Sequence, residues 1–240
     1  MENDLDNRVL FISDDVIVVN KIAGEAMEGA VRGMVDVPAL LYERFGLKDK
    51  GEDFVPVAVH RLDVPVSGCA LFARNTGAAG FLGKAFSRTT DQGGRAEKVY
   101  WAVVELSPSF SGLPAAGELV HWIQSDMKKN KSTACAAANP CGKEAVLRYR
   151  ILGKGKNYGF MELDLITGRH HQIRAQLAAL NIHIKGDIKY GAKRTEKDGG
   201  IRLHARSLCF PDPAAPEHRV RITADPPRMD NLWKDFAAGA

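Results

Sequence analysis

A short polar cluster, His60-Arg61-Leu62-Asp63, interrupts an apolar part of the chain and contains one carboxylate. The apolar residues 55–59 before it predict a strand, and the next apolar run begins after residue 68, so Asp63 is expected where a strand meets a loop. Scaffolds commonly present catalytic groups at such junctions. An Asp beside Arg61 could also form an Asx-turn or a surface ion pair, so this cluster alone leaves its role open.

A second cluster, residues 167–174, is rich in side chains that donate hydrogen bonds. Ile173, Leu177 and Leu180 recur with a helical period after a β-rich run, which predicts a helix over 168–180 with Thr167 as its N-cap. The N-terminal end of a helix favours anions. The first turn of this predicted helix would carry Arg169, His170, His171 and Gln172.

Arg174 follows Ile173 by one residue, which is roughly 100 degrees around the helix. It should therefore border the buried face, where an arginine needs a carboxylate partner.

A metal site is the alternative use of the adjacent His170 and His171. Neighbouring histidines on a helix point in different directions, and no histidine follows at the i+4 position. The four cysteines are far apart in the sequence, and the nearest pair, Cys135 and Cys141, is too widely spaced for a zinc knuckle or a redox pair. We therefore expect free thiols and no bound metal.

The charge of the chain is unevenly distributed. The net charge is +4, but residues 121–210 contain 17 Lys and Arg against 7 Asp and Glu, whereas residues 1–60 contain 6 against 12. A folded, strongly basic stretch of this kind suggests contact with the phosphates of a polyanion. A solvated basic face without a partner is the alternative that charge alone leaves open.

Short apolar or alternating runs predict most of the secondary structure. The predicted strands are 9–12, 16–19, 55–59, 69–74, 99–105, 145–151, 160–166, 201–210 and 219–223. The predicted helices are 38–45, 78–86, 168–180 and 231–236. Strands dominate and the helices are inserted irregularly, so we predict an α+β fold with a mixed, largely antiparallel sheet. Helices and loops would flank a central active-site cleft.

The composition indicates a globular protein with a sizeable core, because 45% of the residues are hydrophobic and 26% are charged. No segment is long enough to separate domains, so residues 1–240 are expected to form one catalytic domain. The first residues are acidic, unlike a secretory or organellar presequence, which predicts a cytoplasmic protein. No amphipathic element is left over, so a monomer without an obligatory protein partner or a membrane contact is expected.

Together, the two clusters and several shorter motifs resemble the RluA family of RNA pseudouridine synthases. His60-Arg61-Leu62-Asp63 with Ser67-Gly68 resembles the catalytic motif of the family, and Lys98-Val99-Tyr100 resembles the strand that carries its active-site tyrosine. The other matches, which keep the order of the family, are Val18-Val19-Asn20-Lys21 with Ala23-Gly24, Lys143-Glu144-Ala145, Thr167 to Arg174 with Gln176-Leu177, Gly186-Asp187 with Tyr190-Gly191, and Leu203-His204-Ala205. The resemblance covers about residues 9–211.

Three positions depart from the usual pattern of the family. Ile22 replaces a proline, Val66 replaces a threonine, and His170 replaces a threonine or serine. None of these changes removes a group on which the chemistry depends. The chain also begins directly with the synthase block, so we expect no S4 RNA-binding domain.

The resemblance implies that the chain isomerises a specific uridine of structured RNA, ribosomal or transfer, to pseudouridine. The base is detached from C1′, rotated and rejoined through C5, without redox change or hydrolysis, so no cofactor is implied. Asp63 would be the nucleophile, and its attack at C6 or its assistance at C1′ both stay open. Arg174 would pair with this aspartate, and Tyr100 would stack on the uracil and relay a proton.

The resemblance also implies how the RNA is held. The target base must leave its stack, and Arg61 would enter the space that it vacates. Leu203 would pack against the uracil. The remaining implied substrate contacts are His60, Arg169, His171 and Gln172. Phosphate contacts would come from Lys128, Lys129, Lys131, Lys154, Lys156, Lys185, Lys189, Lys193 and Arg194.

Two other functions would be compatible with parts of the sequence. One is an RNA-binding protein with a catalytically inactive synthase fold, against which the presence of Asp63, Tyr100 and Arg174 argues. The other is a phosphohydrolase with a nucleophilic aspartate, which would need a second carboxylate close to Asp63 for magnesium. The nearest acidic residues in the sequence are Asp53 and Asp91, so this function is disfavoured.

Overall fold

The computed structural model describes residues 5–49, 51–87, 94–137 and 141–238. The chain forms two compact units, one comprising Met1–Lys98 and Ala205–Pro227 and the other comprising Val99–His204 and Arg228–Ala240. Each unit is therefore assembled from two separate stretches of the sequence. The prediction of a single catalytic domain over residues 1–240 stays a prediction.

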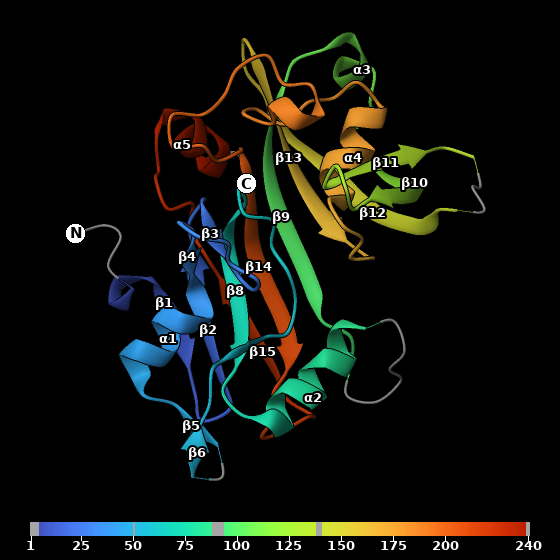
Figure 1. Cartoon of the computed structure of the whole chain (residues 1–240). Helices are drawn as coiled ribbons and strands as arrows, with labels where there is room; N and C mark the ends of the chain where they lie inside the picture. The colour runs from blue at the N-terminus through green and yellow to red at the C-terminus, as the bar shows by residue number, and fades with distance from the viewer. Residues whose placement is uncertain (1–4, 50, 88–93, 138–140, 239–240) are drawn as a thin grey trace. The chain divides into compact units, whose positions relative to one another are not determined.

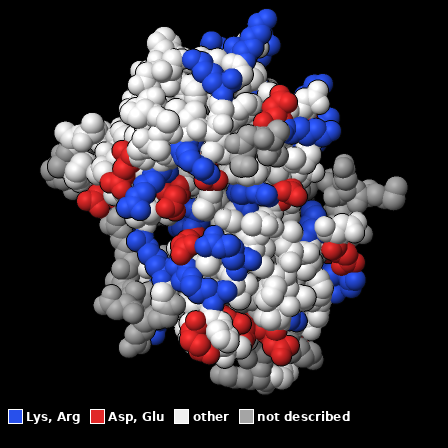
Figure 2. Space-filling model, turned by 180° about the vertical axis from the view of Figure 1, so that it is seen from behind, with Lys and Arg blue, Asp and Glu red and all other residues white. Residues whose placement is uncertain are grey.

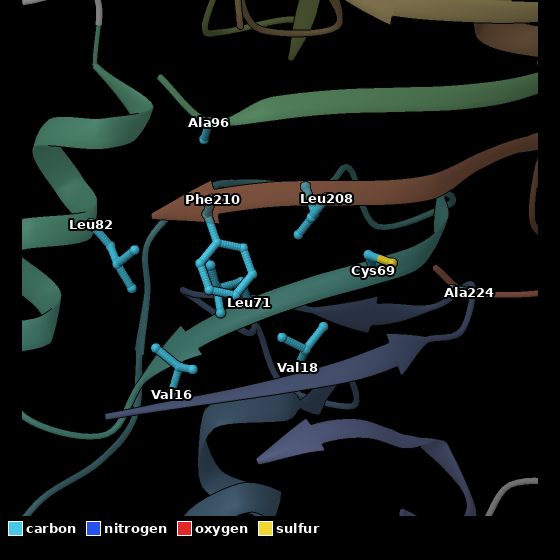
Figure 3. Packing of buried hydrophobic residues seen from close by; sticks show 9 residues of the cluster. All are labelled: Val16, Val18, Cys69, Leu71, Leu82, Ala96, Leu208, Phe210 and Ala224. Carbon is cyan, nitrogen blue, oxygen red and sulfur yellow. The ribbon is translucent and has the colours of Figure 1, made fainter. Parts of the chain in front are cut away.

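The first unit is built on strands in the order β1, β2, β8, β14, with β15 paired to β14 and β7 paired to β8 (Figure 1). The β1–β2, β2–β8, β7–β8 and β14–β15 pairs are antiparallel, whereas β8 and β14 run in the same direction (Figure 3). These strands are β1 (Val9–Ile12), β2 (Val16–Lys21), β7 (Val57–Ala58), β8 (Ser67–Ala73), β14 (Leu203–Pro211, in this unit from Ala205) and β15 (Arg219–Thr223). The short pairs β3 (Glu25–Ala26) with β4 (Val35–Asp36), which is parallel, and β5 (Lys48–Asp49) with β6 (Glu52–Asp53) complete it.

The core of this unit lies between the central strands and helix α2 (Thr76–Phe86). Figure 3 shows the side chains that meet there: Val16 and Val18 from β2, Cys69 and Leu71 from β8, Leu208 and Phe210 from β14, and Leu82 from α2, with Ala96 and Ala224 at the margin. Nearly every residue of β2 and β8 is buried, as expected for central strands that are covered on both faces.

Each longer helix of the first unit begins at a residue that caps it. The carboxylate of Asp36 accepts from Ala39 N–H at the start of α1 (Val37–Phe45), and the amide oxygen of Asn75 accepts from Ala78 N–H at the start of α2. Gly46, with φ of 54°, ends α1 in the left-handed conformation that glycine adopts without strain. A 3-10 turn, η1 (Asp6–Arg8), precedes β1.

The second unit contains five antiparallel strands in the order β9, β13, β12, β10, β11. They are β9 (Glu97–Glu105), β10 (Ala116–Asp126), β11 (Lys131–Cys135), β12 (Lys143–Lys154) and β13 (Tyr158–Leu165). Its helices are α3 (Pro108–Ser111), α4 (Gln172–Ala179), the 3-10 turn η2 (Ile188–Tyr190) and α5 (Asn231–Ala238). Strands β10 and β11 form a hairpin beside α4 (Figure 1).

The two faces of this second sheet carry different helices. Trp233 of α5 packs on Trp101, Val103 and Phe160 on one face. On the other face, Ala175 of α4 packs with side chains of β10 and β12. Gln176 of α4, fully buried, fixes the helix there, because its Nε2 donates to the carbonyl oxygens of Leu119 and Ala145.

The predicted α+β class with a mixed, largely antiparallel sheet is confirmed. The predicted strands 9–12 and 219–223 have the bounds of β1 and β15. The predicted strand 55–59 is shortened to β7, where Pro56 interrupts the run. Strands β10 and β11 were not predicted. Within the described ranges, no helix is long and apolar enough to cross a membrane.

Candidate active site

Asp63 lies in a tight turn after β7, at the kind of junction predicted from the sequence. Its carbonyl oxygen accepts from Val66 N–H at 2.9 Å, which closes the turn. The next carbonyl, that of Val64, accepts from Gly24 N–H at 2.9 Å. The side chain of Asp63 is half-buried. The backbone of this residue is thus held by contacts with the N-terminal part of the same unit.

Lys21, at the end of β2, holds the same turn in place through hydrogen bonds to its main chain. Its Nζ donates to the carbonyl oxygens of Val66 at 2.7 Å, Val64 at 3.1 Å and Asp63 at 3.4 Å, and to that of Ile22. The side chain has no exposed surface. One ammonium group therefore binds three carbonyls of the turn that carries Asp63.

Burial lowers the pKa of Lys21 to about 8, and the negative charges of Glu25 and Asp63 oppose this shift. The group therefore stays protonated at neutral pH, as its contacts with carbonyl oxygens require. Glu25 is itself buried and forms an ion pair with Arg8 at 2.9 Å. In the sequence, Lys21 stands out only as part of a motif. The signal in the sequence was that this lysine directly continues the strand that begins with the apolar residues Val16 to Val19.

Gly68 shows why the turn continues with Ser-Gly. Its φ is +116°, and a Cβ atom there would lie 2.3 Å from the carbonyl oxygen of Ala205 on β14. Only glycine fits this backbone conformation and this close approach. The start of β8, and with it the exit of the Asp63 turn, depends on that contact.

His60 and Arg61 face in different directions. The ring of His60 stacks on Phe86 with centroids 5.0 Å apart, and its Nε2 accepts from Leu71 N–H at 3.1 Å. Burial, with a smaller effect of the Lys98 charge, lowers the pKa of His60 to about 3, so the ring is neutral. Arg61 is exposed. Arg61 is therefore available to a ligand, whereas the described contacts of His60 are internal.

In the second unit, Arg174 has the carboxylate partner that its position on the helix required. Its Nε and Nη2 donate to the two carboxylate oxygens of Asp187 at 2.7 and 2.8 Å, and both side chains are at most 5% exposed. Its guanidinium lies over the ring of Tyr190, 4.8 Å from the centroid. This bidentate pair holds the arginine in one orientation. Pairing of Arg174 with Asp63 stays a prediction.

The predicted start of the helix is wrong. Helix α4 begins at Gln172, and its N-cap is His171 in the left-handed conformation with φ of 52°, not Thr167. The hydroxyl of Thr167 binds other groups instead. It accepts from Val146 N–H of β12 at 2.9 Å and donates to the side-chain oxygen of Gln172. Arg169 therefore precedes the helix in a turn and does not belong to its first turn.

Gln172 holds this turn together. Its Oε1 accepts from Arg169 N–H at 2.9 Å, and its Nε2 donates to the carbonyl of Val146 at 3.1 Å. Arg169 donates from Nε to the carbonyl of Glu144. His171 is buried, and its Nδ1 lies 2.9 Å from the hydroxyl of Tyr190. These three predicted substrate contacts thus form one loop that is anchored on β12 and η2.

Tyr100 lies on the sheet face that α4 covers. It pairs with Leu163 of β13, Leu165 pairs with Leu147 of β12, and residues two apart on a strand share a face, as do directly paired residues. Ala145, on that same face, packs against α4. Tyr100 is 5% exposed. Leu203, at the start of β14, is also buried.

The basic residues predicted to contact phosphates are mostly exposed, but not all of them. Lys128, Lys129 and Lys131 are exposed at the tip of the β10–β11 hairpin. Lys185 differs, because its side chain is largely buried and forms an ion pair with Glu196. On the face shown in Figure 2, Lys and Arg side chains lie next to Asp and Glu side chains and do not form one continuous basic area.

Among the residues that the structure describes, no three His, Cys, Asp or Glu side chains are grouped so that they could hold a metal ion. His170 and His171 are stacked, with ring centroids 3.8 Å apart. Each has an Nδ1 that is engaged by a hydroxyl, that of Ser132 and that of Tyr190 respectively.

Comparison with known proteins assigns the chain to one family. The family model described as RNA pseudouridylate synthase matches residues 15–179. An uncharacterised RNA pseudouridine synthase of Zymomonas mobilis is 34% identical over 207 residues, which are 85% of this chain and 87% of that protein. The tRNA pseudouridine synthase C of Haemophilus ducreyi is 30% identical over 246 residues, with 94% and 92% covered. The ribosomal large subunit pseudouridine synthase C of Rickettsia conorii is 30% identical over 84% of this chain and 62% of its own length.

Solved structures agree on the fold. The human RNA pseudouridylate synthase domain-containing protein 4 superimposes with a TM-score of 0.71 at 22% identity, over 99% of this chain and 94% of that one. The human domain-containing protein 1 gives a TM-score of 0.68 at 20% identity, over 99% and 96%.

Proposed function

This chain belongs to the RluA family of RNA pseudouridine synthases, and we propose that it isomerises one uridine of a structured RNA with Asp63 as the nucleophile. The observation that carries the proposal is the contact of Lys21 Nζ with three carbonyls of the Asp63 turn. A carboxylate is a weak nucleophile, so it must be aimed and shielded from water to react. A turn fixed by a buried ammonium can aim it.

Arg174 orients and holds the negative charge of Asp63 while the base is released. Its Nε and Nη2 are bound to Asp187, so the guanidinium is already oriented before RNA arrives. Tyr100 stacks on the uracil and relays a proton during the rearrangement. Its place on the α4 face supports this role, since Arg174 belongs to α4.

Base flipping brings the uridine to Asp63. A stacked uridine cannot reach a carboxylate in a pocket, so it is extruded at a cost of a few kcal/mol. Arg61, exposed and two residues from Asp63, enters the vacated stack. Leu203 packs against the uracil. His60, Arg169, His171 and Gln172 shape the surfaces around it, through the internal contacts described above.

The substrate is ribosomal or transfer RNA. The relatives named above include a synthase acting on tRNA and one acting on the ribosomal large subunit. We place the enzyme in the cytoplasm with these RNAs, as a monomer without an obligatory protein partner. The reaction is an isomerisation and calls for no cofactor.

The decisive experiment compares wild type with Asp63→Asn on unmodified, in-vitro-transcribed ribosomal and transfer RNA, with pseudouridine mapped at each position. The variant should form no pseudouridine and bind RNA within a few fold of wild type, because one neutral isostere leaves the phosphate contacts intact. Turnover above a few percent would falsify the assignment of Asp63. Wild-type turnover that is unchanged by EDTA separates this function from a magnesium-dependent phosphohydrolase.

An inactive RNA-binding protein with the same fold is the alternative. It would bind the same RNAs yet leave every uridine unchanged in this assay. The joint presence of Asp63, Tyr100 and Arg174 argues against it, because RNA binding alone gives no reason to keep all three side chains.

A further inference from the structure

The tip of the β10–β11 hairpin is tied to the rest of the second unit by polar contacts. At the tip, Asn130 adopts a left-handed conformation with φ of 45°. Its side-chain oxygen lies 3.0 Å from Nε2 of His170, and its carbonyl accepts from Nζ of Lys189 at 3.1 Å. The side-chain oxygen can only accept, so Nε2 of His170 carries the hydrogen.

A second tie lies two residues further along, at Ser132. Its hydroxyl is 2.9 Å from Nδ1 of His170, and its backbone N–H donates to the hydroxyl of Tyr190 at 2.8 Å. Ser132 is 1% exposed. With Nε2 protonated, the Nδ1 of the neutral His170 ring accepts a hydrogen bond from the hydroxyl of Ser132. One ring therefore binds the last residue of the turn, Asn130, and the second residue of β11, Ser132, at once.

The same histidine touches the site. The ring of His170 stacks on that of His171, whose Nδ1 is bound to the hydroxyl of Tyr190. The ring of Tyr190 lies against the guanidinium of Arg174. A continuous set of contacts thus runs from the hairpin tip through His170 to the loop before α4 and to the arginine of the proposed site.

The hairpin needs these polar contacts because apolar packing holds its root but not its tip. Near the root, Ile123 of β10 packs with Ala175 of α4 in an apolar cluster. The tip carries Met127, which is 75% exposed, with exposed lysines on either side of the turn. Two strands alone are marginally stable in water. Without polar ties, the direction of the tip would be poorly fixed.

We propose that His170 is a positioning residue that sets the direction of the β10–β11 tip, so that Lys128, Lys129 and Lys131 meet the RNA backbone already in place. This deepens the proposed function and rests on it.

The test is a double-mutant cycle on RNA affinity, with a fluorescein-labelled RNA stem-loop as the probe. His170→Ala should weaken binding about 5-fold, the effect of about one lost hydrogen bond. In a background in which all three lysines are alanine, the same change should cost less than about 2-fold, because the residues through which it acts are gone. Asn130→Ala should resemble His170→Ala, and His218→Ala, an exposed histidine of the other unit, should bind like wild type.

Turnover distinguishes positioning from general damage. His170→Ala should raise KM about 5-fold and leave kcat at saturating RNA within about 2-fold. His170→Gln, whose amide nitrogen can replace Nε2 and donate to Asn130, should recover most of the affinity. The positioning role would be overturned if His170→Ala lost RNA affinity equally in the wild-type and triple-alanine backgrounds, or if it bound RNA like wild type. In either case, pseudouridine formation by the wild-type protein would leave the proposed function standing. If wild type forms no pseudouridine, the proposed function fails, and the binding cycle still decides whether His170 positions the tip.

Discussion

The ammonium group of Lys21 donates to the main-chain carbonyl of Asp63 across 3.4 Å, although 42 residues separate them in the sequence. The contact reaches the backbone and not the carboxylate, so it fixes where the side chain starts without neutralising it in a direct ion pair. The proposed nucleophile thus has its position set by one buried cation on its own unit.

Lys21→Met should lower the unfolding free energy by about 2 kcal/mol and turnover by more than about 10-fold. Methionine fills a similar volume but leaves buried carbonyls of the Asp63 turn without a donor, which costs about 1–3 kcal/mol. Urea unfolding and single-turnover assays measure both effects. Lys84→Met, at an exposed position of α2, is the matched control and should resemble wild type. Full turnover by Lys21→Met would show that the turn holds its shape without the ammonium.

Arg174→Ala and Asp187→Ala should each destabilise the protein by about 3–5 kcal/mol, because each leaves one buried charge unpaired. The double variant should lose much less than the sum of the two, since it removes both charges together. Denaturant unfolding of the four proteins gives the coupling energy. Strict additivity would mean that the two side chains contribute to stability independently and not through their ion pair. Both Arg174 variants should also be nearly inactive, because the guanidinium is proposed to hold Asp63.

His60 should make the protein sensitive to acid. Its pKa is about 3 in the fold and about 6.5 in the unfolded chain, so the unfolded state takes up a proton first and stability is lost as the pH falls below 6.5. The loss from this one group is about 2 kcal/mol at pH 5. His60→Gln can still accept from Leu71 N–H but cannot titrate. Its unfolding free energy should therefore fall about 2 kcal/mol less than that of wild type when the pH is lowered from 7.5 to 5.

The control for this pH experiment is His218→Gln, because His218 is exposed. Its unfolding curve should follow wild type at both pH values. Parallel pH profiles for wild type and His60→Gln would indicate that His60 titrates normally in the folded protein.

The lysines of the hairpin tip should determine the salt dependence of RNA binding. Log affinity should fall linearly with log salt, with a slope of about −0.7 for each phosphate engaged on a single strand. Changing Lys128, Lys129 and Lys131 to Glu should flatten this slope and weaken substrate and non-substrate RNA about equally. The same reversal at Arg32, Lys84 and Arg95, exposed on the first unit, should leave the slope unchanged. If the two triple variants had equal slopes of log affinity against log salt, the lysines of the hairpin tip would not contact phosphates.

Arg61→Ala should slow the modification step and leave the salt slope nearly unchanged, because its proposed task is to stabilise the flipped state. Single-turnover rates at saturating RNA, measured beside equilibrium affinity, separate the two effects. If Arg61→Ala binds RNA poorly but has a normal single-turnover rate at saturating RNA, Arg61 acts only as a further phosphate contact.

The sequence predicted those parts of the fold that depend on local pattern. Strand β1 is a short run of apolar residues and strand β15 alternates polar with apolar residues, so neither needs a distant partner to be recognised. The turn at Asp63 was expected because polar residues and Pro65 follow a run of valines. These features arise within a window of about ten residues, where side-chain period and turn chemistry decide the conformation.

The parts that were missed depend on residues far apart in the chain. Arg174 was expected to need a carboxylate, but no local pattern revealed that Asp187, 13 residues further along the chain, binds its guanidinium. Thr167 looked like an N-cap because nothing local revealed that β12 uses its hydroxyl. Hairpin β10–β11 was overlooked, although Leu119, His121 and Ile123 are buried and Val120 between them is exposed. His121 interrupts the apolar series on the inner face, and the apolar Val120 and Trp122 lie on the other face, so the strand does not alternate clearly in the sequence.

The division of each unit between two stretches of sequence has a consequence during synthesis on the ribosome. The first 98 residues contain β2 and β8, but β14, the other neighbour of β8, belongs to this unit only from Ala205 onward. Until more than 100 further residues have been made, the edge of β8 that β14 covers is paired with a strand of this unit only at Phe72 and Ala73, by β7. An apolar edge that is largely unpaired invites pairing with other chains. A nascent chain stalled between residues 98 and 205 should therefore be prone to aggregation, because the first unit can be completed only after residues 205–227 have been made.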